Sequence, residues 1–387
     1  MTDIFILSTA RTAIGSFGGS LAAMSTIDIA THAAKAAIAR AGIEAGQVGT
    51  VVFGHVINTE PRDMYLARVA AMQAGVPETT PAMNVNRLCG SGAQAIVSAV
   101  QMLLLGDAEI ALAGGAECMS RAPYVVQSAR FGQKMSDTTM LDMMTGALTC
   151  PFGTGHMGIT AENVAARYGL TREAQDAFAL ESQNRAARAI AEGRFVDQIT
   201  PIELSGRKGH TIFAQDEHPK ATTAAALASL RPAFAKDGTV TAGNASGIND
   251  GAAAVILARA DAVGRARARV MGYAVAGVDP KVMGLGPIPA VQALCAKLGV
   301  KPESFDVVES NEAFAAQAMA VTQALGLDPT HVNPNGGAIA LGHPVGATGA
   351  ILVAKALAEL ERSGGKTGLI TMCIGGGQGI ALAIERA

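Results

Sequence analysis

Cys89 has the residue type and the surroundings of a nucleophile. It lies in the sequence Leu-Cys-Gly-Ser-Gly, after a short apolar run, 81–85, and before a helical pattern, 91–105. A thiol near a helix N-terminus meets unpaired N–H groups and the positive end of the helix dipole, and both favour the thiolate. We therefore predict a nucleophilic cysteine. The alternative is a small buried apolar residue, which is the commoner role of a lone cysteine.

His343 has the surroundings of a base with fixed geometry. It lies in Leu-Gly-His-Pro-Val-Gly, where glycine and proline closely bracket it. A histidine that takes the proton of Cys89 would complete a nucleophile–base pair. A structural histidine is the alternative.

Cys373 and Asn311 are two further polar residues at the ends of apolar runs. Cys373 precedes three glycines, 375–377, whose backbone N–H groups could form an oxyanion hole around Gly375. The thiol could then shuttle protons, or it could be a core residue before a tight turn. A dinucleotide loop is poorly supported, since no G-x-G-x-x-G opens a helix here. Asn311 could cap the following helix or hold a water or a carbonyl oxygen.

The elements that must position these residues alternate between helix and strand. In the first third we predict helices at 27–41, 65–74 and 91–105 and strands at 51–57, 82–85 and 109–113. In the last third we predict helices at 290–298, 312–325 and 346–362 and strands at 305–308 and 368–372. This alternation predicts an α/β fold with a mostly parallel sheet covered by helices on both faces.

The order of elements repeats between the two ends of the chain. Cys89 lies 38 residues after Val51, and His343 lies 38 residues after Phe305. We therefore predict two equivalent halves whose third helices aim their N-termini at one shared site.

Three parts are expected along the chain. Residues 1–117 form an N-terminal core half, completed by part of 240–258, and residues 250–387 form the C-terminal half. Between them, 118–249 is rich in Met, Gly and charged residues and contains one long helix, 172–192. We interpret this insertion as a loop domain that forms lids and contact surfaces.

Composition limits the class of protein. Charged residues make up 16% of the 387, well below the usual ~25%, which indicates large buried interfaces in an oligomer. A net charge of −2 excludes a global basic field for nucleic acid. The five cysteines are widely spaced, which is typical of a reducing compartment, so we expect a cytoplasmic protein. We expect neither a targeting segment nor a membrane span.

Together these motifs resemble those of the thiolase family, in family order and over essentially the whole chain. They are Leu-Cys-Gly-Ser-Gly at Cys89, Asn-Glu-Ala-Phe at 311–314, Gly-His-Pro at 342–344 and Cys-Ile-Gly-Gly-Gly at 373–377. Within the family the chain looks closest to bacterial acetyl-CoA acetyltransferases and to 3-ketothiolases of polyhydroxyalkanoate synthesis. The resemblance implies duplicated βαβαβ halves in a layered α-β-α-β-α core, with a large loop-domain insertion in the first half.

The resemblance also implies a reaction, the reversible ping-pong Claisen condensation of acyl-CoA with acetyl-CoA to 3-ketoacyl-CoA, and the reverse thiolysis. Cys89 would carry the acyl group, His343 would activate it, and Cys373 would exchange a proton with the α-carbon of acetyl-CoA. Asn311, through a water, and His343 would hold the enolate, while the N–H groups of Cys89 and Gly375 would hold the acyl-thioester oxygen. Such donors must be in place where the enolate charge develops.

The resemblance implies coenzyme A thioesters as substrates, with no metal and no tightly bound cofactor, and a homotetramer built as a dimer of dimers. The residues expected around coenzyme A are His156, Met157, Lys220, Ala242, Gly243, Ser246, Met283 and Phe314. Lys220 stands near a common family arginine and would supply a point charge without the bidentate fork. The acyl pocket would be lined by part of 119–148.

Two other functions remain as alternatives. A decarboxylating ketosynthase of the same fold superfamily would lack an equivalent of Cys373. A non-catalytic scaffold for acyl groups or coenzyme A would leave Cys89 unacylated.

Overall fold

The computed structural model describes residues 3–206, 209–260 and 265–387. Its centre is a mixed sheet in the order β14-β15-β16-β13-β1-β12-β5-β3-β4, and a short strand, β2 (Gly15–Ser16), pairs with β12. The other strands are β1 (Ile4–Arg11), β3 (Thr50–Gly54), β4 (Ala82–Val85), β5 (Ile110–Cys118), β12 (Asn249–Arg259), β13 (Ala268–Gly277), β14 (Val307–Ser310), β15 (Thr367–Ile374) and β16 (Gln378–Arg386).

The two halves of this sheet repeat one another, as the sequence predicted. In the first, β3 runs parallel to β4 and β5, and β12 and β1 follow antiparallel. In the second, β14 runs parallel to β15, β16 and β13 follow antiparallel, and Val332 bridges β14 in the place of β4. The halves join where β1 meets β13 over two residue pairs.

The prediction of a mostly parallel sheet is wrong. In the first half β12 pairs antiparallel with both β5 and β1. In the second half β16 pairs antiparallel with both β15 and β13. In the second half a tight turn makes this return: Gly376 and Gly377 have φ of +83° and +87°. A turn this short can join only antiparallel neighbours. In the first half the return follows the long insertion.

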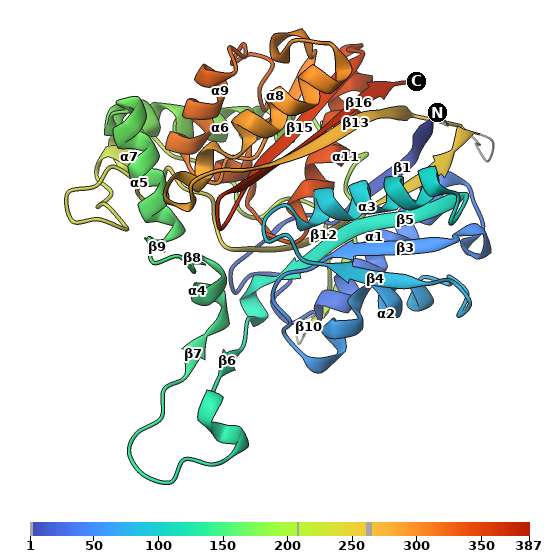
Figure 1. Ribbon diagram of the computed structural model, residues 1–387, viewed down its shortest axis with the longest axis horizontal. Coiled ribbons are helices and arrows are strands. Elements are labelled where there is room, and N and C mark those ends of the chain that lie inside the picture. The colour runs from blue at the N-terminus through green and yellow to red at the C-terminus, as the bar shows by residue number, and fades with distance from the viewer. Residues whose placement is uncertain (1–2, 207–208, 261–264) are drawn as a thin grey trace.

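The helices and the folded-back sheet form five layers (Figure 1). Helices α3 (Ser91–Leu105) and α11 (Thr348–Ser363) lie side by side in the middle layer and contact strands of both halves. Gly92 permits this approach, because a Cβ there would lie 2.8 Å from the backbone N of Ala350. The outer layers are α1 (Thr26–Ala41) with α2 (Leu66–Gln73), and α8 (Pro287–Leu298) with α9 (Ala315–Ala324). The layered α-β-α-β-α core is therefore confirmed.

Helix α3 also explains an unusually apolar segment. In the described part of the chain, Leu88–Leu105 is long and apolar enough by composition to cross a membrane, with a mean hydropathy of 1.6. The helix packs on β3, β5 and α11, so the core accounts for its composition. Gly106, with φ of +83°, ends it in the left-handed conformation that favours glycine.

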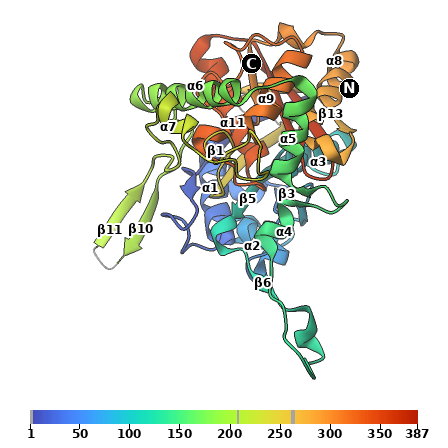
Figure 2. The ribbon, with the colours of Figure 1, turned by 90° about the vertical axis from the view of Figure 1, so that its left-hand side faces the viewer.

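The insertion forms projections and a helical cap over one end of the core (Figures 1 and 2). An arm carrying β6 (Tyr124–Val125) and β7 (Leu141–Asp142) extends far from the body, and a hairpin of β10 (Ile202–Gly206) and β11 (Gly209–Phe213) projects separately. The predicted long helix is α6 (Arg172–Ala191), capped by Thr171. The insertion also contains three helices that were not predicted, α5 (Met157–Tyr168) and the short helices α4 (Met143–Ala147) and α7 (Ala224–Ala228).

Candidate active site

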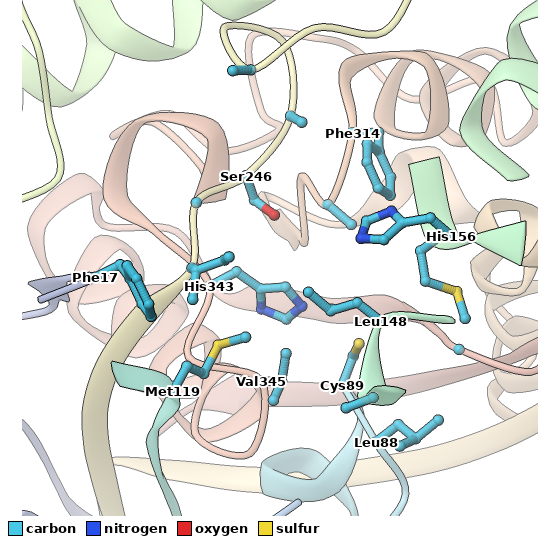
Figure 3. A pocket seen from close by; sticks show the side chains of 18 of the residues that line it. Phe17, Leu88, Cys89, Met119, Leu148, His156, Ser246, Phe314, His343 and Val345 are labelled. Carbon is cyan, nitrogen blue, oxygen red and sulfur yellow. The ribbon is translucent and has the colours of Figure 1, made fainter. Parts of the chain in front are cut away.

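A pocket of about 490 Å³ is lined by all three predicted reactive side chains, Cys89, His343 and Cys373. Figure 3 shows the Cys89 sulfur and the His343 imidazole turned toward the same space. Each reactive residue lies near one end of a core element. Cys89 precedes α3, His343 precedes α11 by five residues, and Cys373 lies near the end of β15. The duplicated fold therefore aims both halves at one site.

A strained turn presents Cys89. Leu88 has φ of +44°, which side chains other than glycine rarely adopt. Asn86 Oδ1 accepts from the Leu88 N–H at 2.9 Å, and the Ser91 hydroxyl donates to the Leu88 carbonyl at 2.6 Å. The same hydroxyl oxygen accepts from the Arg87 N–H at 2.9 Å. These bonds hold the strain and leave the thiol at the pocket surface.

Burial raises the pKa of the Cys89 thiol, and the nearby Glu117 carboxylate raises it further. The N–H groups of Gly375 and of Cys89 itself face the sulfur and lower the pKa, but by less. The N–H donors thus favour the thiolate, as the sequence predicts, but desolvation outweighs them, so the pKa of Cys89 is raised overall. The thiol is protonated near neutral pH and needs a base.

His343 is suited to be that base. Its Nδ1 lies 2.7 Å from Thr348 Oγ1, and the Thr348 hydroxyl donates to the Pro344 carbonyl at 2.9 Å. Since that hydroxyl has one proton, Nδ1–H must donate to Thr348, which leaves Nε2 as the acceptor. Asn249 Oδ1 fixes the loop by accepting from the His343 N–H at 2.9 Å. Burial lowers the pKa of His343 to about 4, so the imidazole is neutral at physiological pH.

We expect the His343 ring to titrate near pH 4, well below the ordinary value of 6.5. Between pH 4 and pH 6.5 the unfolded chain binds a proton at His343 and the folded chain does not. The contribution of His343 to the free energy of unfolding therefore rises with pH from about 4 to 6.5. Histidine NMR signals followed against pH would measure the midpoint, and a His343→Gln variant would assign them. A midpoint above 6 would contradict the desolvated environment.

Asn311 lies behind His343 and does not line the pocket. It is 1% exposed, and its Nδ2 is 3.4 Å from His343 Nε2. Its Oδ1 has no hydrogen-bond partner among the described residues. Helix α9 begins only at Ala315, so the alternative that Asn311 caps this helix is wrong.

Cys373 and the glycine turn complete the inner wall. Cys373 is 1% exposed, and burial together with the neighbouring Cys89 raises its pKa. Gly375 packs closely, because a Cβ there would lie 3.2 Å from Leu88 Cδ1 and 3.4 Å from Met157 Cε. The Gly375 N–H of this turn faces the Cys89 sulfur.

Most of the residues predicted to surround coenzyme A line the same pocket. They are His156, Met157, Lys220, Ala242, Ser246, Met283 and Phe314. Gly243 is not among the lining residues: a Cβ on it would meet Leu227 and Leu230 instead. Met119 and Leu148 line the pocket, but most of the segment between them forms the projecting arm.

Several further residues of this pocket were not predicted from the sequence. Phe234 stacks on His156 with ring centroids 4.7 Å apart and meets Phe314 edge-on at 6.1 Å. Phe17 and Val345 lie on the opposite side of Cys89 and His343 (Figure 3). Phe234 and Phe17 lie in irregular segments without periodicity, so no local signal marks them. His218 also lines the pocket, and its place two residues before the predicted Lys220 was the signal that could have found it. Burial lowers the pKa of His218.

Comparison with known proteins finds relatives that match almost the entire chain. Residues 4–261 match the family model of the thiolase N-terminal domain, and residues 264–386 match that of the thiolase C-terminal domain. The chain is 55% identical to the beta-ketothiolase BktB of Cupriavidus necator, over 99% of both chains. It is 50% identical to an acetyl-CoA acetyltransferase of Pseudomonas aeruginosa, over 100% of both.

Solved structures give the same result. Human mitochondrial 3-ketoacyl-CoA thiolase superposes with a TM-score of 0.98 at 44% identity, over 100% of this chain and 99% of the other. The Bacillus anthracis acetyl-CoA acetyltransferase superposes with a TM-score of 0.97 at 43% identity, over 100% and 99%. Both halves of the fold and both family models thus agree, and the chain belongs to the thiolase family of acyltransferases.

Proposed function

We propose that this protein catalyses the reversible ping-pong Claisen condensation of acyl-CoA with acetyl-CoA to 3-ketoacyl-CoA, and the reverse thiolysis, through an acyl group on Cys89. The observation that carries the proposal is one pocket holding a protonated thiol, a neutral histidine and a second thiol. A cysteine, a base and a separate proton shuttle are what a ping-pong acyl transfer requires.

In the first half-reaction His343 Nε2 takes the proton of Cys89. The thiolate attacks the thioester carbonyl, and the N–H groups of Cys89 and Gly375 stabilise the oxyanion. The carbon–sulfur bond to coenzyme A breaks, and the leaving thiolate takes the proton of Cys373. The half-reaction ends with acyl-Cys89, imidazolium at His343 and a thiolate at Cys373.

In the second half-reaction the Cys373 thiolate takes an α-proton from acetyl-CoA. Imidazolium at His343 and Asn311, through a water, stabilise the enolate oxygen. The enolate carbon attacks acyl-Cys89, the new carbon–carbon bond forms, and Cys89 leaves as a thiolate that regains its proton from His343. Every proton is returned, which agrees with thiols that burial keeps protonated at rest.

A direct test is to mix the protein with acetyl-CoA, quench it in acid and locate the acetyl group by mass spectrometry. We expect one acetyl group per chain, on the peptide that contains Cys89. Because the thioester is labile to hydroxylamine, treatment with it should remove the label. A chain that stays unlabelled would support the scaffold alternative and reject this mechanism.

Further parts of the proposal concern ligands and assembly. Coenzyme A thioesters are the substrates, no cofactor is tightly bound, and Lys220 meets the nucleotide phosphates as a point charge. We propose a cytoplasmic homotetramer that supplies 3-ketoacyl-CoA for polyhydroxyalkanoate synthesis. The exposed apolar side chains of the projecting arm support an assembly, because Phe131 and Met135 are 90% and 84% exposed in the single chain.

A further inference from the structure

A small buried cavity lies next to Asn311 and shares no lining residue with the substrate pocket. Its polar walls are Arg11, Asn311, Thr348 and Lys355, and all four side chains are buried. It offers about 10 Å³ to the centre of a water molecule. That volume is close to the least that holds one water, which needs at least two polar partners.

Two elements place polar side chains face to face around this cavity. Glu309 lies on β14, and Asn311 directly follows that strand, with its N–H still bonded to the Thr371 carbonyl of β15, so the two residues continue the same alternation and share one side. On α11, Thr348 is seven residues before Lys355, so both lie on one face of the helix. His343 contacts one residue from each pair, Thr348 from the helix and Asn311 from the strand side.

Two of the four polar walls have most of their hydrogen-bonding capacity used by the protein. Four of the five N–H groups of the Arg11 guanidinium donate to Asp216, Gln198 and the Thr12 carbonyl. The Thr348 hydroxyl is used by Pro344 and His343.

The other two walls have complementary open capacity. Lys355 Nζ donates to Glu309 Oε2 at 2.6 Å and to the Gly336 carbonyl at 2.8 Å, so its third proton has no acceptor among the described residues. Asn311 Oδ1 is a buried acceptor without a donor. A water that accepts from the ammonium and donates to the amide oxygen satisfies both.

We propose that a water in this cavity links Lys355 to Asn311 and that Lys355 is a positioning residue for the enolate site. The inference rests on the proposed function of Asn311. A side-chain amide that turns over exchanges its donor for an acceptor, and the water through which Asn311 acts would then donate to the amide oxygen and no longer be polarised by Nδ2 toward the enolate oxygen. Fixing Oδ1 on the side of Lys355 keeps Nδ2 on the side of His343. Glu309 compensates the buried ammonium, which would otherwise be costly to bury.

The test replaces Lys355 by methionine, which keeps the length of the side chain and removes its donors. We expect exchange of the α-protons of acetyl-CoA with D₂O to slow on the order of tenfold, the effect of losing one buried hydrogen bond. Acetylation of Cys89 should be unchanged, which a merely structural role of Lys355 would not produce. The double variant Lys355→Met/Glu309→Leu removes both buried charges and serves where the single variant folds poorly.

The effect must also pass through Asn311. In an Asn311→Ala background, Lys355→Met should cause no further loss of exchange, and equal losses in both backgrounds would overturn the proposal. Unchanged exchange in the single variant would overturn it as well. A crystal structure of the unaltered protein should show a water within hydrogen-bond distance of Lys355 Nζ and Asn311 Oδ1. Failure of the unaltered protein to acetylate Cys89 would instead reject the proposed function.

Discussion

Replacing Cys89 by alanine is expected to abolish turnover while leaving the fold intact. The substitution removes the sulfur that carries the acyl group, and loss of a catalytic nucleophile lowers kcat on the order of 10⁴-fold to 10⁶-fold. The side chain is only half-buried, so the free energy of unfolding should change by no more than about 1 kcal/mol. Thiolysis of acetoacetyl-CoA by coenzyme A, followed by absorbance, together with thermal melts, measures both quantities.

Cys295→Ala is the matched control for this result. Cys295 is 4% exposed in α8 and belongs to a core cluster apart from the pocket. Its replacement should lower the free energy of unfolding by about 1 kcal/mol and leave turnover intact, the opposite pattern to Cys89→Ala. Substantial turnover in Cys89→Ala would mean that acyl transfer bypasses a covalent intermediate.

The elements around Cys89 were predictable because their signals are local. The bounds of β4 and α3 agree with the sequence prediction, since an apolar run and two glycines, Gly90 and Gly106, mark them directly. The repeated spacing also predicted that His343 would meet Cys89, although these residues are 254 positions apart. Order along the chain was enough there because each half folds in the same way.

The properties that depend on distant neighbours were not predictable. The direction in which the pKa of Cys89 shifts is set by burial of the thiol, which nothing adjacent in sequence reports. The antiparallel return of β12 beside β5 follows the long insertion, so nothing adjacent in sequence specifies it, whereas the glycine turn before β16 is a local signal. Gly243 carries the same local pattern as its neighbour Ala242, yet only Ala242 reaches the pocket.

The amide of Asn311 illustrates the same limit. Its sequence context fits a helix cap as well as a catalytic donor, and the start of α9 at Ala315 rejects only the first. The partner that we propose for its oxygen, Lys355, comes from α11, more than 30 residues later, and lines the same cavity. Position in the fold, and not residue type, therefore makes this asparagine distinctive.

Replacing Cys373 by alanine is expected to separate the two half-reactions. Cys89 and His343 remain, so acetyl-CoA should still acetylate Cys89, more slowly because the leaving coenzyme A thiolate loses its proton donor. Exchange of the α-protons of acetyl-CoA with D₂O should fall about 10²-fold to 10⁴-fold, because that is the usual contribution of a positioned acid or base. Mass spectrometry of Cys89 and NMR of the acetyl methyl group measure the two steps separately.

Cys150→Ala is the matched control, since Cys150 is 3% exposed and belongs to the same buried cluster as Cys373 but does not line the pocket. Cys150→Ala should keep both acetylation of Cys89 and exchange of the α-protons. A loss of exchange in Cys373→Ala alone therefore cannot be explained by looser packing of the cluster. If Cys373→Ala still exchanges α-protons at the full rate, His343 must be the group that removes them. The neutral imidazole, which takes the proton of Cys89 in the first half-reaction, would then have to serve as base in both.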